Sequence, residues 1–152
     1  MLFTVDQANR TLPLVRRIVE DVVRDHRRWQ EKILELELVA STEGGRQQQQ
    51  LEGKQQELDG TPLGRSDEEQ LTAVLERDAM TIARDIDAYE RELEELGIVL
   101  KDRRLGLVDF PSEIDGRRVW LCWRLGEPSV QYWHDLDAGY AGRQPLPAAA
   151  LK

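Results

Sequence analysis

The side chains best suited to chemistry are concentrated between residues 105 and 143. This stretch holds six of the nine aromatic residues, the only cysteine and one of the two histidines. Asp109, Cys122 and His134 would form a nucleophilic site if the imidazole lay within hydrogen-bonding distance of the thiol, beside an oxyanion site. The competing interpretation is a buried small thiol and a structural histidine at the end of a strand.

A metal site is another interpretation of the same stretch. His134, Asp135 and Asp137 offer one imidazole and two carboxylates, which would hold a weakly bound, partly hydrated ion. A structural zinc site normally takes four Cys or His ligands, and one cysteine with two histidines cannot supply them within one chain. Arg143 would hold an anion or pair with an acidic side chain. No cofactor follows from this set. The candidate ligand-binding residues are Asp109, Cys122, Glu127, His134, Asp135 and Arg143.

The elements that position these residues are short strands. Asp115-Gly116 is typical of a two-residue type I′ hairpin turn. Because such a turn fixes the register of its strands, Asp109 is expected opposite Cys122. The alternation of apolar and polar residues predicts an antiparallel β-meander and C-terminal segment over residues 98–143, with strands at 98–101, 105–111, 119–125 and 130–134.

The first predicted hairpin has two unlike faces. The face opposite to Asp109 and Cys122 is wholly apolar and is expected to be buried. It consists of Val108, Phe110, Val119, Leu121 and Trp123. The register of the next strand is open. A three-residue turn at Gly126 places His134 beside Trp120, on the face of Asp109 and Cys122, whereas a four-residue turn places it on the other face.

Two long helices are expected to support this sheet as an antiparallel, coiled-coil-like hairpin over residues 11–96. A capped turn at Thr4 precedes the first helix, which is expected to begin near Thr11 with Pro13 in its first turn. The second helix is expected to begin at Ser66 and to end at Gly97. The connection, residues 41–65, is rich in glycine and glutamine and predicts a mobile tip.

The apolar seams of the two helices match in length. Aligning them end to end pairs the large Trp29 with the small Ala79. Further apolar residues lie off the seams, among them Ile18, Val23 and Val74. Because one short sheet would leave part of this surface uncovered, we expect a homo-oligomer, most simply a two-fold dimer.

Chain length and net charge limit the kinds of protein that this sequence can encode. The chain of 152 residues predicts a single domain, 1–152, and its net charge of -8 argues against a nucleic-acid partner. The beginning of the chain lacks the features of a signal peptide, and no stretch approaches the length of apolar sequence that spans a membrane. With no internal disulfide available to Cys122, the sequence favours a cytoplasmic protein without a membrane partner.

Three blocks of sequence resemble a known family. They are GLVDFPS (106 to 112), GRRVWLCWRLGEP (116 to 128) and YWHDLDAGYAGRQP (132 to 145), behind a helical half that opens with FTVDQANRTLPLV. The chain resembles, over nearly its whole length, the short bacterial and archaeal proteins of the domain of unknown function 2203 family. This resemblance implies a prokaryotic cytoplasmic protein and supplies no catalytic residue.

Together these observations predict an α+β protein, a long antiparallel helical hairpin followed by a small antiparallel β-meander. The sequence does not identify a biochemical activity. The expected function is a non-enzymatic protein-interaction or regulatory module built on an oligomerising helical hairpin, which would also present a surface to a protein partner. The alternative is a small-ligand- or metal-binding enzyme that uses the polar face of the C-terminal sheet.

Overall fold

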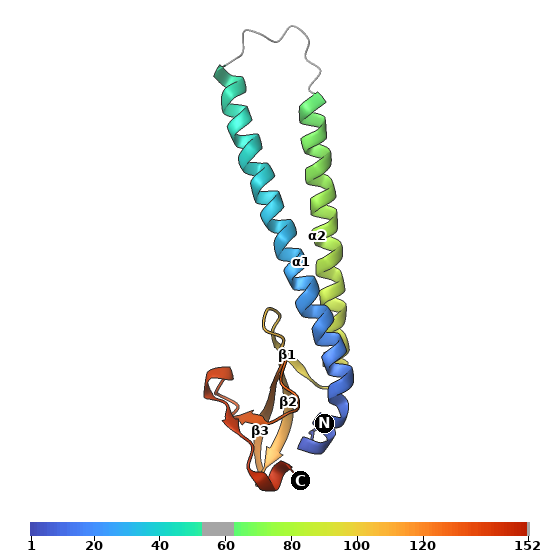
Figure 1. The fold of residues 1–152 in the computed structure, drawn as a ribbon, viewed down its shortest axis with the longest axis vertical. Coiled ribbons are helices and arrows are strands. Elements are labelled where there is room, and N and C mark those ends of the chain that lie inside the picture. Colours follow the sequence, from blue (N-terminus) through green and yellow to red (C-terminus); the bar gives the residue numbers. More distant parts are fainter. Residues whose placement is uncertain (53–62, 152) are drawn as a thin grey trace. The chain divides into compact units, whose positions relative to one another are not determined.

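Two long helices precede a five-stranded sheet in the described part of the chain (Figure 1). The computed structural model describes residues 1–52 and 63–151, and the side chains of residues 1–41 and 67–150. The chain divides into two compact units. One combines Met1–His26 with Asp85–Lys152, and the other is Arg27–Arg84. The first unit is therefore discontinuous in sequence.

The first helix, α1, spans Val5–Glu52 and begins earlier than expected. Thr4 and Gln7 form the predicted capping box, with the backbone N–H of each donating to the side-chain oxygen of the other at 3.0 and 3.1 Å. This box caps the whole of α1 and not a separate turn, so Pro13 lies inside the helix. Val5 and Ala8, which precede Pro13, are buried in the core, and this packing offsets the cost of an interior proline.

The second helix, α2, spans Leu63–Glu95 and ends as predicted at a glycine. Gly97 has a φ of 85°, in the left-handed region. Its backbone N–H donates to Glu94, and that of Ile98 donates to Leu93, both at 2.9 Å. These two bonds form a Schellman motif. At the other end of the hairpin, helix occupies part of the predicted tip 41–65, and residues 53–62 lie outside the described residues.

The strands form an antiparallel meander in the order β1-β2-β3-β4-β5. Asp115 and Gly116 have φ values of 51° and 78°, as a type I′ turn requires, and the predicted register follows, with Asp109 opposite Cys122. The last strand was not predicted, because two residues show no periodicity. The strands are β1 Val99–Asp102, β2 Leu107–Ile114, β3 Arg117–Arg124, β4 Tyr132–His134 and β5 Gln144–Pro145.

In the discontinuous unit, helices and sheet share one core. The predicted apolar face of the first hairpin is buried, including Phe110 and Trp123. It joins a cluster that includes Val15 and Val19 of α1 and Leu93 of α2. The N-terminal segment completes this core, since Phe3 is buried and its ring meets that of Phe110 edge-on at 5.3 Å.

The unit Arg27–Arg84 contains the remaining parts of α1 and α2. Among its described side chains, the buried apolar ones are Leu75, Ala79 and Ile82 of α2, at the spacings of three and four residues that are typical of a helical seam. Lys32 of α1 and Asp78 of α2 form an ion pair at 3.9 Å, so the two helices lie side by side at these residues. The Trp29–Ala79 layer itself stays a prediction. Neither helix has, over its described residues, an apolar stretch sufficient to cross a membrane.

Candidate functional site

The register of the sheet brings the three main candidate residues together. Asp109 on β2 pairs with Cys122 on β3. On the other side of β3, Cys122 pairs with Tyr132 and Trp120 pairs with His134 of β4. Because residues two apart on a strand share a face, the side chains of Asp109, Cys122 and His134 lie on the same face of the sheet. This is the arrangement predicted for the shorter of the two possible turns after β3.

The cluster is closed to solvent. Asp109 is 1% exposed, Cys122 is 0% exposed and His134 is 3% exposed. A carboxylate oxygen, the thiol sulfur and an imidazole nitrogen, one from each residue, all lie within 4.8 Å of one another. The predicted convergence is therefore present, but at a buried position and not on an open concavity.

His134 is held at both ring nitrogens. Its Nε2 lies 3.0 Å from each carboxylate oxygen of Asp109, and its Nδ1 lies 2.8 Å from the backbone oxygen of Asp135. A carbonyl oxygen only accepts, so Nδ1 must carry a hydrogen and donate it. Nε2 and Asp109 then share one further proton, either on an imidazolium or on a neutral carboxyl group. The pair carries no net charge in either case.

The pKa of Asp109 reflects the burial of its side chain. Desolvation raises the pKa of Asp109 above its ordinary value, although the hydrogen bond to His134 opposes this effect. A buried carboxylate without a partner would cost several kcal/mol, on the order of the penalty for an uncompensated buried ion. The shared proton with His134 removes that penalty.

Cys122 is a thiol at neutral pH. Burial raises its pKa to about 11, and the charge of Asp109 adds to this effect, while Arg143 opposes it. A nucleophilic cysteine needs a lowered pKa and a free base beside it. Both ring nitrogens of His134 already have partners in Asp109 and Asp135, so the arrangement lacks the base that a thiol nucleophile requires.

A second group of side chains lies next to the cluster and centres on Arg143. The guanidinium donates two parallel hydrogen bonds to Glu127, both 2.8 Å long. It also stacks on Tyr132 and Tyr140, with its central carbon 3.9 and 4.5 Å from the two ring centroids. Glu127 accepts a further bond from the backbone N–H of Arg124 at 2.7 Å. Arg143 is thus paired with an acidic residue, the second of its two predicted fates.

The structure separates the carboxylates of Asp135 and Asp137 from the cluster. Asp135 pairs with Arg117 at 2.9 Å through a half-exposed side chain, and Asp137 is exposed. Among the residues with described side chains, the group of potential metal ligands that converges is Asp109, Cys122 and His134. Asp135 contributes to it through its backbone oxygen, which orients His134.

The sequence did not predict that two tyrosines would pack on Arg143. Tyr132 of β4 lies opposite Cys122 of β3, a pairing that follows only from the shorter of the two turns that the sequence left open. Tyr140 follows Gly139 in a single 3₁₀ turn, where its hydroxyl accepts a bond from Arg124 at 3.1 Å. The spacing of aromatic and arginine residues in this stretch was the available signal, but it does not specify contacts between them.

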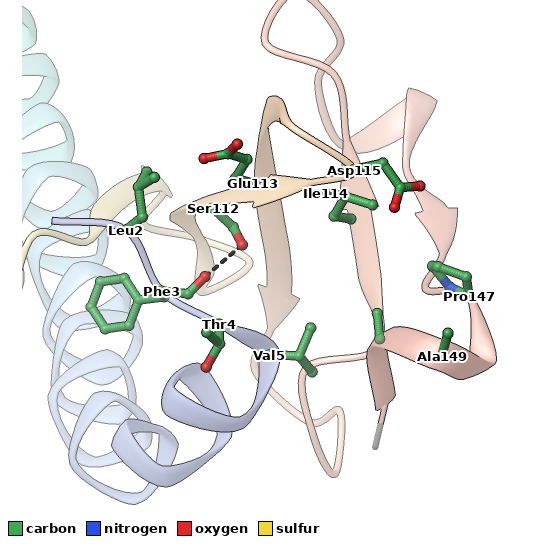
Figure 2. A pocket seen from close by; sticks show the side chains of 11 residues that line it. Leu2, Phe3, Thr4, Val5, Ser112, Glu113, Ile114, Asp115, Pro147 and Ala149 are labelled. Carbon is green, nitrogen blue, oxygen red and sulfur yellow. Dashed lines mark hydrogen bonds between the residues drawn. The ribbon is translucent and has the colours of Figure 1, made fainter.

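A separate open pocket of about 550 Å³ lies beside the N-terminal residues (Figure 2). Leu2, Ile114 and Pro147 contribute apolar parts of its lining. Ser112 helps to close one wall by donating a hydrogen bond of 2.5 Å to the backbone oxygen of Phe3. None of the candidate ligand-binding residues lines this pocket, so it is distinct from the buried cluster.

Comparison with known proteins places the chain in a family. Curated proteins and solved structures provided no match. A family profile described as an uncharacterized conserved protein does match, and it covers residues 1–146, which include both helices, the sheet and the whole buried cluster. The resemblance noted in the sequence is confirmed: the chain belongs to the DUF2203 family.

Proposed function

We propose that this chain is a non-enzymatic interaction module that self-associates through its helical unit, Arg27–Arg84. The observation that carries this proposal is the placement of exposed apolar side chains. Of the eight large apolar side chains that are exposed in the described part of the chain, five belong to this unit. They are Leu34, Leu38, Leu71, Val74 and Met80.

The spacing of these residues places exposed apolar side chains together on one face of α1 and on one face of α2. Leu34 and Leu38 are four residues apart on α1, so they share one helix face. Leu71 and Val74 are three residues apart on α2 and also share a face. Two helices bury one stripe each against the other, and a second pair from another copy would cover the rest in a four-helix arrangement.

Two of the three apolar residues that led us to expect a dimer are covered within the chain itself. Ile18 is buried in the core of the discontinuous unit, and Val23 packs against that core. Val74 alone of the three remains exposed, at 43%. Support for self-association therefore comes from the helical unit and not from the surface next to the sheet.

The buried cluster supports a role without catalysis. Its thiol is protonated at neutral pH and its histidine is held at both nitrogens, as described above. We place the protein in the cytoplasm of a prokaryote, because the lone Cys122 has no partner for an internal disulfide and the family is expected there. A protein partner that binds the same helical faces would compete with self-association, so each would regulate the other.

Sedimentation equilibrium of the full chain tests the proposal. We expect a reversible dimer at micromolar concentration, and we expect the double variant Leu34→Gln, Leu38→Gln to raise the dissociation constant at least roughly tenfold, which corresponds to about 1.4 kcal/mol. Leu136→Gln is the matched control, since Leu136 is an exposed leucine of the other unit. A strict monomer, or equal effects of both variants, would show that these faces do not mediate association.

The alternative function, a small-ligand- or metal-binding enzyme on the polar face of the sheet, is favoured by one observation. Asp109, Cys122 and His134 present three different donor atoms to one point. This convergence supports metal binding on its own, without a reaction, and it does not depend on self-association.

A further inference from the structure

We propose that Asp109, Cys122 and His134 bind one divalent metal ion of the zinc type, through a carboxylate oxygen, Sγ and Nε2. The three donor atoms come from three neighbouring strands and lie within 4.8 Å of one another. Zinc binds such atoms at about 2.0 to 2.3 Å, so the ligands of a tetrahedral site lie roughly 3.4 to 3.8 Å apart. The donor atoms of the cluster thus lie within about 1 Å of the spacing that a tetrahedral site requires.

The orientation of His134 is that of a metal ligand with its supporting hydrogen bond in place. Metal-binding histidines nearly always donate the hydrogen of the second ring nitrogen to a carbonyl or carboxylate oxygen. Here Nδ1 donates to the backbone oxygen of Asp135 at 2.8 Å. Nε2 therefore points into the cluster, toward the carboxylate of Asp109.

The composition of the cluster selects the class of ion. Thiolate and imidazole ligands favour zinc and similar ions, whereas magnesium and calcium prefer sites made of oxygen atoms. A divalent ion with one carboxylate, one thiolate and one neutral imidazole forms a group with no net charge, which suits a position closed to solvent. Three protein donors leave one tetrahedral position for a water molecule.

Three charged side chains act on the cluster, Lys101 on Asp109 and the pair Arg143 and Glu127 on Cys122. The charge of Arg143 is balanced by its bidentate pairing with Glu127. Its guanidinium interacts with the thiol in a way that stabilises negative charge on the sulfur. A metal-bound thiolate would keep this supporting interaction, as outer ligands do in metal sites.

Cobalt titration of the full chain tests this site, because a cobalt thiolate absorbs in the near ultraviolet. We expect the chelator-treated protein to bind one Co²⁺ per chain with sulfur-to-cobalt absorption, Zn²⁺ to displace it, and millimolar Mg²⁺ to leave it unchanged. The free ion should also raise the melting temperature of the wild-type protein, since it binds the folded state only. No sulfur-to-cobalt absorption and no thermal shift in the wild type would overturn the proposal.

Variants assign the site to its residues. Cys122→Ala should abolish the sulfur-to-cobalt absorption, and His134→Gln should weaken Co²⁺ binding by more than the roughly 10- to 100-fold that outer-shell partners contribute. His26→Gln is the matched control, because His26 is the only other histidine and lies on α1. Circular dichroism establishes that each variant is folded. Binding that persists unchanged in a folded Cys122→Ala or His134→Gln variant would also overturn the proposal. The thermal shift of the wild type decides the question if either variant does not fold.

Discussion

A single backbone oxygen determines how the buried histidine can interact with its neighbours. Because the carbonyl of Asp135 holds the hydrogen of Nδ1, the Nε2 of a neutral His134 is an acceptor that faces Asp109. The sequence could not predict that Asp135 orients His134, because any residue type can offer a backbone oxygen. The chemistry of the cluster therefore depends on a group that sequence comparison does not reveal.

This assignment makes two substitutions of Asp109 behave differently. Asp109→Asn should be tolerated in metal-free protein, because the amide hydrogen donates to Nε2 of a neutral His134. Asp109→Leu should cost about 1 to 3 kcal/mol, because it leaves a buried acceptor without a partner. Urea unfolding at neutral pH in the presence of a chelator measures both. Equal losses in the Asn and Leu variants would show that a hydrogen bond from position 109 to Nε2 does not stabilise the fold.

Cys122 predicts a dependence of stability on alkaline pH. Its pKa is about 11 in the folded protein, above the ordinary value of 9.0, so folding favours the protonated thiol. This stabilisation is complete below about pH 9 and is lost as the pH rises through the folded value. Relative to Cys122→Ala, the metal-free wild type should lose about 2 kcal/mol of unfolding free energy between pH 8 and about 11.5. The titrations of tyrosine and lysine are common to both proteins and cancel in the comparison. If the difference in unfolding free energy between the two proteins stayed constant over this pH range, the raised pKa of Cys122 would be refuted.

Among the elements, the connection between β1 and β2 is tightly constrained by one glycine. Gly106 has a φ of 72°, and a Cβ atom there would lie 2.8 Å from Leu125 and 2.9 Å from Val19. Asp102 closes the same turn, since its Oδ1 accepts bonds from the backbone N–H groups of Arg104 and Leu105, both at 2.8 Å. The turn thus fits against α1 only without a side chain at Gly106.

Comparison of two glycines separates backbone strain from steric overlap. Gly126→Ala introduces strain alone, because Gly126 has a φ of 105° and no atom lies within 4 Å of its Cβ position. It should cost about 1 kcal/mol. Gly106→Ala should cost roughly 1 to 3 kcal/mol more, because it also overpacks the core. Thermal or urea unfolding gives both values, and equal losses would mean that the core adapts freely.

The helical unit allows a test of the predicted alignment of α1 and α2. Ala79 is buried, and the alignment places it beside the large Trp29. Ala79→Leu should overpack that layer and cost about 1 to 3 kcal/mol. Exchange of the exposed Glu76 for Gln, three residues away, should be close to neutral. A harmless Ala79→Leu would show that Trp29 packs elsewhere.

The elements that could be predicted from the sequence are those whose conformation is determined by local residue types and spacing. The seams of the helices, Gly97 and the turn at Asp115 are local signals, and each has the expected structure. Strand β4 has no such signal, because its register depends on distant contacts. Val130 is buried, and its backbone N–H donates to the side chain of Asn9 on α1 at 2.7 Å. No local pattern could predict that bond.

For the molecule as a whole, the two proposals concern different units of the chain. The metal ligands belong to the discontinuous unit, and the exposed leucines of α1 belong to Arg27–Arg84. Substitutions without shared partners usually have additive effects. We expect the Leu34→Gln, Leu38→Gln variant to retain its Co²⁺ affinity, and Cys122→Ala to retain its association constant. Titration and sedimentation of both variants measure this, and a change in both properties by one variant would show that the sites are coupled.

The unit Arg27–Arg84 lies, in sequence, between the two parts of the discontinuous unit, and this order affects folding during translation. Phe3 packs in a core that also needs Phe110 and Leu146, so the discontinuous unit cannot complete its core until synthesis has passed residue 146. Residues 27–84 depend on contacts closer in sequence, which form faster. The growing chain therefore carries the N-terminal apolar residues of α1 uncovered for most of its translation. A chaperone that binds nascent chains would find its substrate in residues 3–19, and its absence should lower the soluble yield more than it alters the stability of the finished protein.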